Sequence, residues 1–143
     1  MNPSSLECSV RQEIIQVNQK LLDAIMAGDW NTYQALCSKD LTCLEPEAPG
    51  QVVVGLDFHK FYFAPSLAGS APGNASKRVQ TTMAGTQVHL HGDTAVLAYV
   101  RLVQIAGPDG SFQTKSTAET RVWQKIDGKW VHIHFHRTPL GGA

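Results

Sequence analysis

The chain has 143 residues, a length that suits one domain with a single hydrophobic core. With 43% hydrophobic and 17% charged residues, its composition is that of a globular protein and not of a disordered one. Twelve Lys and Arg residues balance twelve Asp and Glu, which gives a formal net charge of zero. Because nucleic-acid backbones and anionic membrane surfaces attract basic proteins, we expect neither as a partner. A zero net charge does permit self-association.

Three cysteines, Cys8, Cys37 and Cys43, form an odd set with no C-x-x-C pair. A disulfide framework or a zinc site typically shows paired cysteines, so we expect neither. The pattern indicates a reducing, cytoplasmic location, with the cysteines packed in the core. We expect no metal and no cofactor.

The first predicted element, after an N-terminal tail of residues 1–9, is a long amphipathic helix. Its apolar positions lie three or four residues apart, at Val10, Ile14, Val17, Leu21 and Ile25. A second apolar row makes the stripe wide, as is typical of a helix that packs on a sheet. Gly28 suits the position just beyond the helix end, and Asp29 is expected to cap a second short helix over residues 30–37.

Shorter elements follow these helices. Residues 41–44 and 52–54 are predicted strands on either side of a turn that contains Pro46. The aromatic run over residues 58–63 is predicted as a third short helix. Residues 64–76 are rich in Ala, Gly, Ser and Pro and are predicted to form a mobile loop.

From residue 77 onward the hydrophobic pattern alternates with period two, which predicts strands. Four strands are expected, over residues 79–91, 95–105, 112–126 and 130–137. Asp127–Gly128 is predicted to form a two-residue hairpin turn between the last two of them. Because the helices precede this meander, the sequence predicts an α+β domain in which a curved antiparallel sheet packs on the long N-terminal helix.

Strand alternation places three arginines on or beside the apolar face of three successive strands, at Arg101, Arg121 and Arg137. If they converge, they line one cavity, and the planar fork of donors on each guanidinium suits a carboxylate or phosphate. The alternative is that each arginine pairs with an internal acid, because burying an unpaired charge costs on the order of several kcal/mol. The candidate acids are Glu45, Glu47, Asp57 and Glu119.

Histidines alternate along the last predicted strand, at His132, His134 and His136, and alternation places them on the outer face. The inner face would then carry Val131, Ile133, Phe135 and Arg137. Side chains two apart on a strand lie roughly 6.5–7 Å apart, so a metal would need a further ligand from a neighbouring strand. No cysteine or acid in register supplies one. We expect instead an outer face partly covered by another subunit, where histidines can make the contact sensitive to pH.

Several segments together resemble the association, or hub, domain of calcium/calmodulin-dependent protein kinase II. They are EIIQVNQKLLDAIMAGDW, LTCLEPEAPGQVVVGLDFHKFYF, AVLAYVRLVQ and ETRVWQKIDGKWVHIHFHR. The resemblance covers nearly the whole chain, and we place the hub domain at residues 10–138, with a C-terminal tail at 139–143. It implies the nuclear transport factor 2-like cone, a curved antiparallel sheet that cups a long N-terminal helix.

The resemblance also implies a structural role. Hub domains of this family form dimers that assemble into a closed, two-tiered ring, which implies self-association of twelve or more subunits. Further partners would be kinase domains or kinase-linker segments, and a small carboxylate held in an arginine-lined cavity. The implied ligand-binding residues are Arg101, Arg121, Arg137, His59, Tyr62, Tyr99 and Glu119. The sequence shows no kinase or calmodulin-binding segment, which fits an excised domain or a stand-alone hub.

An alternative is a small-molecule enzyme with the same cone fold, such as an isomerase or dehydratase, or a stand-alone carboxylate-binding protein. Such an enzyme needs a general base in its cavity, and arginine stays protonated near neutral pH. Only His59, Glu45 and Glu119 remain as groups that can transfer protons. His59 lies in an aromatic run, where a packed histidine is more common than a pocket ligand. We therefore expect a non-catalytic protein.

Overall fold

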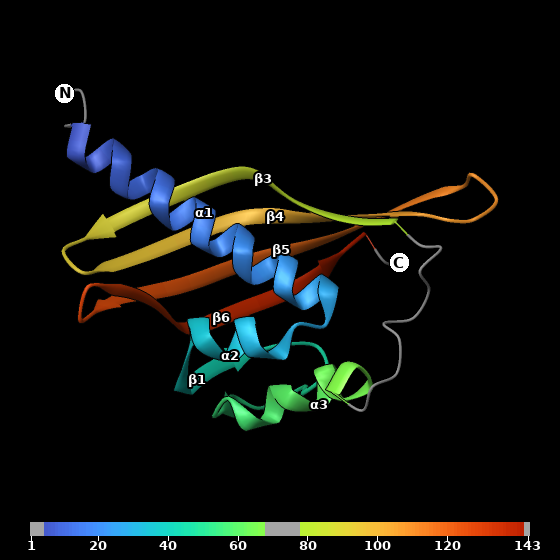
Figure 1. Cartoon of the computed structure of the whole chain (residues 1–143), viewed down its shortest axis with the longest axis horizontal. Coiled ribbons are helices and arrows are strands. Elements are labelled where there is room, and N and C mark those ends of the chain that lie inside the picture. The colour runs from blue at the N-terminus through green and yellow to red at the C-terminus, as the bar shows by residue number, and fades with distance from the viewer. Residues whose placement is uncertain (1–4, 68–77, 142–143) are drawn as a thin grey trace.

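The computed structural model describes residues 5–67 and 78–141 (Figure 1). Its elements are α1 (Ser5–Ala27), α2 (Trp30–Leu36), β1 (Cys37–Leu44), β2 (Val53–Val54), α3 (Asp57–Leu67), β3 (Arg78–His91), β4 (Thr94–Ala106), β5 (Phe112–Ile126) and β6 (Lys129–Leu140). All the predicted helices and strands are present. Helix α1 begins five residues before its predicted start, and β6 extends three residues beyond its predicted end.

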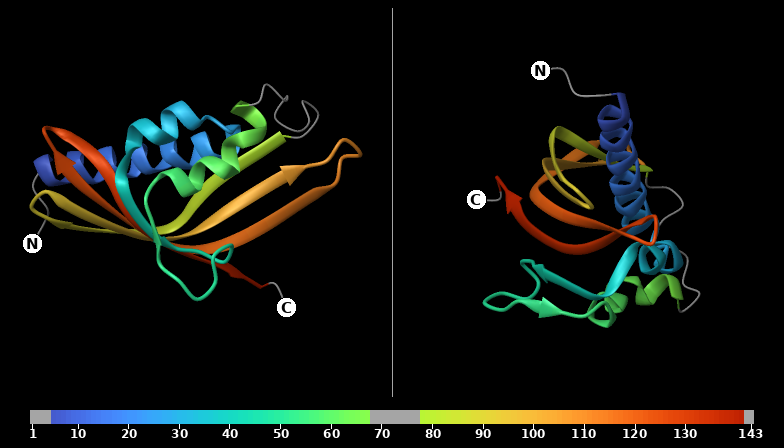
Figure 2. Two further views of the ribbon diagram at one scale, coloured as in Figure 1. Left: turned by 90° about the horizontal axis from the view of Figure 1, so that it is seen from below. Right: turned by 90° about the vertical axis from the view of Figure 1, so that its left-hand side faces the viewer.

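The six strands form one curved sheet in the order β2-β1-β6-β5-β4-β3. Strands β3 to β6 are the predicted antiparallel meander, but β1 pairs with β6 in parallel, so the sheet is mixed and not purely antiparallel. The three helices lie on one side of the sheet, and its other face is left uncovered by them (Figure 2). The chain is therefore an α+β domain with the long helix on the concave face, as predicted.

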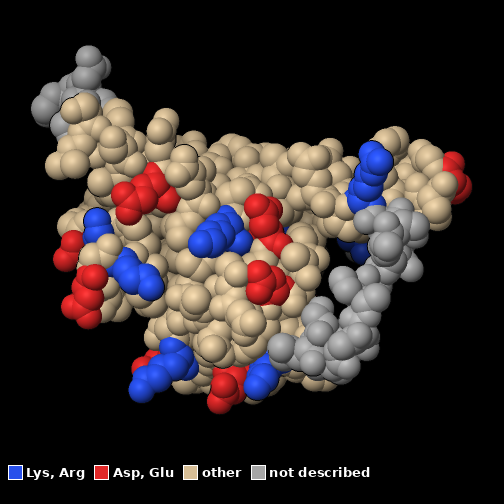
Figure 3. Space-filling model, in the orientation of Figure 1, with Lys and Arg blue, Asp and Glu red and all other residues tan. Residues whose placement is uncertain are grey.

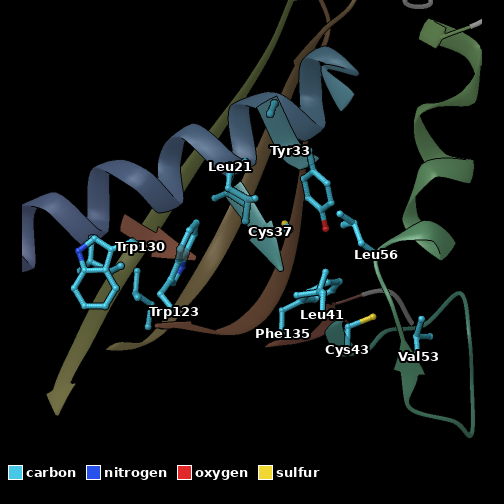
Figure 4. Packing of buried hydrophobic residues seen from close by; sticks show 14 of the residues in the cluster. Leu21, Tyr33, Cys37, Leu41, Cys43, Val53, Leu56, Trp123, Trp130 and Phe135 are labelled. Atoms are coloured by element: carbon cyan, nitrogen blue, oxygen red, sulfur yellow. The ribbon is translucent and has the colours of Figure 1, made fainter. Parts of the chain in front are cut away.

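The core fills the space between α1 and the concave face of the sheet. Ile14, Leu21 and Leu22 of α1 are fully buried, as are Leu97 of β4 and Trp123 of β5. Figure 4 shows Leu21 and Trp123 among the buried side chains of the core. Their spacing along α1 is that of the predicted apolar stripe, and burying such side chains is the main favourable term in folding. None of the helices in the described part of the chain combines the length and the apolarity that a bilayer crossing requires.

Local signals in the sequence set the ends of several elements as predicted. The Asp29 side chain accepts a hydrogen bond from the Thr32 N–H at 3.1 Å and so caps α2. Gly28, after the end of α1, has a φ of 67°. Asp127 and Gly128 both have positive φ, as the type I′ turn between β5 and β6 requires.

A β-bulge in β6 changes which residues face the core, and the predicted alternation is wrong at this point. The β5–β6 register shifts at Trp123, which lies opposite His132, and Ile133 is the extra residue. One extra residue interrupts the two-residue period of a strand. His132 is therefore fully buried beside Phe135, with ring centroids 5.7 Å apart, whereas Val131 lies on the outer face.

Two further expectations need correction. The segment predicted as a loop from residue 64 begins as helix, because α3 continues to Leu67, and residues 68–76 lie outside the described part of the chain. Cys37 and Cys43 are buried as predicted, but Cys8 is exposed on α1. Cys8 lies in the first turns of α1, away from the buried stretch of the helix that begins at Ile14.

Candidate functional site

A cavity of about 220 Å³ lies between the concave face of the sheet and the three helices. Its lining combines apolar, aromatic and charged side chains: Ile25, Met26, Tyr33, Glu45, His59, Tyr62, Phe63, Arg101, Arg121, Phe135 and Arg137. Five of the seven residues expected to bind a ligand are in this lining. The other two, Tyr99 and Glu119, are buried beside the arginines and contact them. This volume is below the roughly 300–1,000 Å³ of pockets for drug-sized ligands, so it would fit only a smaller molecule.

Glu119 holds two of the arginines in place. Its carboxylate lies 3.0 Å from Arg121 Nη2 and 3.5 Å from Arg101 Nη1, and its side chain is completely buried. Burial alone raises the pKa of Glu119, but the guanidinium groups of Arg121 and Arg101 outweigh this and hold that pKa below its ordinary value. Glu119 is therefore a charged carboxylate paired with Arg101 and Arg121. For these two arginines the structure bears out the alternative that each one pairs with an internal acid.

A buried hydrogen-bond network ties the same carboxylate to α1. Tyr99 Oη donates to Glu119 Oε1 at 2.7 Å, and Asn18 Nδ2 of α1 donates to Tyr99 Oη at 3.0 Å. Trp123 Nε1 in turn donates to Asn18 Oδ1 at 2.9 Å. These hydrogen bonds give each of the buried polar groups a partner and connect the long helix to the floor of the cavity.

Arg101 differs from the other arginines of the cavity in one respect. Its Nε donates to Thr81 Oγ1 at 3.1 Å and its Nη1 to Glu119, but its Nη2 has no hydrogen-bond partner among the described residues. The side chain is only 7% exposed. A buried guanidinium donor without a partner carries the full cost of its desolvation, so Arg101 is the arginine of this cavity whose hydrogen bonding is incomplete.

Arg137 stands nearer to solvent, between two acids. Its Nε lies 3.6 Å from Glu45 Oε2, its Nη2 contacts Glu47 Oε1, and its side chain is 21% exposed. Burial raises the pKa of Glu45 above its ordinary value, although Arg137 acts in the opposite direction. Three arginines therefore face three glutamates in and around this cavity, so its walls carry little net charge.

Cys43, Glu45 and His59 form a buried cluster that sequence spacing did not predict. Cys43 Sγ lies 3.6 Å from His59 Nε2, and His59 Nδ1 lies 4.0 Å from Glu45 Oε1. Burial and the positive charges of Arg121 and Arg137 lower the pKa of His59 to about 4, so the imidazole is neutral at physiological pH. The three residue types can all bind a metal, but the two nearby arginines oppose a cation there.

His132 is buried beside Arg121, whereas strand alternation predicts that it lies on the outer face of the sheet. Its Nε2 is 3.5 Å from Arg121 Nη1 and its Nδ1 is 3.4 Å from Cys37 Sγ. Burial and the charge of Arg121 lower its pKa well below the ordinary value, so this histidine is neutral. Arg121 is also stacked over the Phe135 ring at 4.5 Å, and its position is thus fixed on every side.

Comparison with known proteins identifies a family that shares this chain's pattern. Residues 10–141 match the family described as the calcium/calmodulin dependent protein kinase II association domain. The chain is 44% identical over 140 residues to the calcium/calmodulin-dependent protein kinase type II alpha chain of Drosophila melanogaster. The match covers 96% of this chain and 26% of the fly protein, so the chain spans about a quarter of the length of that relative.

Solved structures agree with this match. The association domain of the Caenorhabditis elegans kinase is 42% identical, with a TM-score of 0.82 and coverage of 94% of this chain and 99% of that one. The hub homology domain of Chlamydomonas reinhardtii is 44% identical, with a TM-score of 0.81 and coverage of 91% and 97%. An NTF2-like protein of Cytophaga hutchinsonii, 21% identical with a TM-score of 0.66, shares the fold over 91% of this chain and 98% of its own.

Proposed function

Because this chain belongs to the family of calcium/calmodulin-dependent protein kinase II association domains, we propose that it is a non-catalytic hub that binds copies of itself. In this proposal dimers join into a closed, two-tiered ring of twelve or more subunits. A closed ring needs either two different self-contacts or one heterologous contact repeated around an axis. Kinase domains or kinase-linker segments would be held by the ring.

One surface carries the proposal of self-association. We call it the outer face, and it consists of the side chains of β3 to β6 that alternate with the buried ones. In β4 and β5 it comprises every second residue from Thr94 to Leu102 and from Ser116 to Gln124, with Thr82, Ala84, Gln87, His89 and His91 in β3 and Val131, His134, His136 and Thr138 in β6. None of these described residues is buried, and none is Asp, Glu, Lys or Arg; the same alternation continues to two exposed cations beyond them, Arg78 at the start of β3 and Lys129 at the start of β6.

Such a face is suited to a second copy of itself. Side chains of both charge signs are scattered over the helix side of the molecule (Figure 3). The outer face has small and β-branched side chains at its centre, such as Ala98, Val100 and Val122, all of them partly exposed. In a two-fold contact each surface meets its own copy, so a face without formal charges avoids like-charge repulsion.

Replacing Thr120 by lysine tests this surface. Thr120 lies between Ala98 and His136 near the middle of the outer face, so Thr120→Lys would set like charges against each other across the contact. We expect the dissociation constant of the assembly to rise at least about a hundredfold, because opposed like charges cost several kcal/mol. Sedimentation velocity would measure it. Gln16→Lys, which adds the same charge on an exposed position of α1, is the control, and an unchanged mass for Thr120→Lys would exclude this face.

The groups that can transfer protons are poorly placed for catalysis. Glu119 is bound to two arginines, and the pKa of His59 is lowered to about 4 by burial first and by nearby arginines second. Burial raises the pKa of Glu45, but its two carboxylate oxygens contact Arg137 and Tyr62, so neither is left open toward a substrate. A general base works best with a pKa near the operating pH and an unoccupied lone pair toward the substrate. These observations favour a binding role for the cavity over an isomerase or dehydratase role.

We further propose that the cavity holds a small monocarboxylate. The support is the buried Nη2 of Arg101, a cationic donor with no partner among the described residues. Because the three arginines, Arg101 included, are balanced by three glutamates, one added negative charge is better accommodated than two. The residues that would surround this ligand are Arg101, Arg121, Arg137, His59 and Tyr62, with Tyr99 and Glu119 behind them.

Changing Arg101 to lysine tests this site without removing the positive charge. The ammonium group lacks the planar fork, so Arg101→Lys is expected to weaken binding of butyrate at least about tenfold. Isothermal titration calorimetry with butyrate, and with succinate as the dianion, would measure this. Arg78→Lys, on an exposed arginine at the start of β3, is the matched control. Equal butyrate affinity in the wild type and Arg101→Lys would remove Arg101 from the site.

A further inference from the structure

Histidines are the only ionisable side chains on the outer face as defined above. Four of the six histidines of the chain lie there, and the other two are buried inside. His89 and His91 lie on β3, opposite Val96 and Thr94 of β4. Alternate residues of one strand point to the same side, so each pair of histidines presents two imidazoles to whatever covers this face.

The second pair of histidines lies on the same face, on β6, which is at the opposite edge of these four strands from β3. His134 is partly buried, lies opposite Val122 of β5, and has its Nδ1 2.7 Å from Thr42 Oγ1 of β1. His136 is exposed and lies opposite Thr120 of β5. The outer face thus has an uncharged centre between two strands that each carry a histidine pair.

The charged groups around these histidines do not supply them with buried counter-ions. Asp93 follows His91 in the β3–β4 turn and is exposed, as is Asp40 on β1, two residues before Thr42. His136 shares a shallow hollow with Glu45 and Arg137, which are paired with each other at 3.6 Å. It shares a second one with Glu119, whose carboxylate is paired with Arg101 and Arg121.

We propose that acidification opens the self-contact of the outer face, because protonation of His89, His91, His134 and His136 places positive charges in a contact that is otherwise uncharged. This inference rests on the proposed self-association through that face. Histidine is the side chain whose charge ordinarily changes between about pH 5 and 8. The contact is therefore stable at neutral pH and is lost over a mildly acidic range.

The direction of the pH effect follows from the linkage between proton binding and assembly. Covering an imidazole with another subunit disfavours its charged form, so its pKa is lower in the assembly than in the free subunit. The assembly accordingly binds fewer protons, and its stability is fully present above the free-subunit pKa and is lost as pH falls. In the single chain, burial and then His136 already lower the pKa of His134. Each unit of such a difference raises the dissociation constant about tenfold at acidic pH.

The test is the mass of the complete chain by sedimentation velocity at about pH 7.5 and about pH 5.5, on either side of the histidine range. We expect the wild type to be assembled at the higher pH and to dissociate reversibly at the lower one. Tryptophan fluorescence and circular dichroism at both pH values separate dissociation from unfolding. Replacing the four outer-face histidines by glutamine is expected to keep the assembly intact at both.

The possible results separate this inference from the proposal beneath it. A chain that is monomeric at the higher pH overturns self-association and the inference together. A wild type that stays assembled at the lower pH overturns the inference alone, as does a glutamine variant that dissociates like the wild type. If the fourfold variant does not fold, His89→Gln with His91→Gln, both on exposed positions of β3, is used instead and is expected to lower the pH of dissociation. No shift in that variant or in the corresponding β6 pair also contradicts the inference.

Discussion

Replacing Trp123 with alanine is expected to lower the free energy of unfolding by about 3–5 kcal/mol, because the indole is removed from the centre of the core. The side chain is fully buried, and its ring packs against His132 with centroids 5.0 Å apart. Its Nε1 donates the hydrogen bond to Asn18 Oδ1 that connects α1 to the sheet. The substitution therefore leaves a cavity and an unsatisfied buried amide oxygen. Urea unfolding followed by circular dichroism would measure the loss.

Trp123→Phe is the control for this prediction. It keeps a large ring in the core but removes the donor to Asn18, so it is expected to cost about 1–3 kcal/mol, the penalty of an unsatisfied buried acceptor. The two variants separate packing from hydrogen bonding. A loss near zero for Trp123→Ala would mean that the indole is not in the core.

Replacing Glu119 with glutamine is expected to lower the free energy of unfolding by about 3–5 kcal/mol, because it leaves two buried guanidinium groups without their counter-ion. The side chain of Arg121 is 1% exposed and that of Arg101 is 7% exposed, so water cannot take the place of the lost charge. Burial raises the pKa of Glu119, but the two arginines lower it by more, and the net pKa is below the ordinary value. The charged form is therefore the one that stabilises the fold. Urea unfolding at neutral pH would measure this.

The matched control is Glu47→Gln, which removes the same charge from an exposed partner of Arg137. The Glu47 side chain is 38% exposed, and such an ion pair is worth at most about 1 kcal/mol. The pH dependence gives a second readout. Because the folded-state pKa of Glu119 is lowered, its contribution is present above the ordinary glutamate pKa and is lost as pH falls through the lowered value. The Glu119→Gln variant lacks that part of the acid-induced loss, and equal stability of both variants would contradict the prediction.

Alternation along the strands was enough to predict that Arg101, Arg121 and Arg137 lie on the inner side of the sheet. It failed at His132, because a bulge depends on how β6 pairs with β5 and leaves no simple mark in the hydrophobic pattern. The same reasoning did not find the cluster of Cys43 and His59, which join β1 to α3. Their contact is made by packing between elements that have no shared periodicity.

The choice between free and paired arginines was open in the sequence for a similar reason. The alternation along β5 predicts that Glu119 and Arg121 lie on one face of the strand, but it does not predict which of their atoms are in contact. The structure shows Glu119 shared by two arginines and leaves one donor of Arg101 without a described partner. That single unpaired donor, and not the number of arginines, is the observation on which the proposed carboxylate site rests.

The sequence by itself determined the order and type of the elements, the helix caps and the face on which most side chains lie, because these follow from local periodicity and backbone preference. Only the tertiary structure decided the parallel pairing of β1 with β6, the inward turn of His132 and the partners of each buried charge. These depend on distances between residues far apart in the chain, and such distances are set when the sheet and the helices pack together.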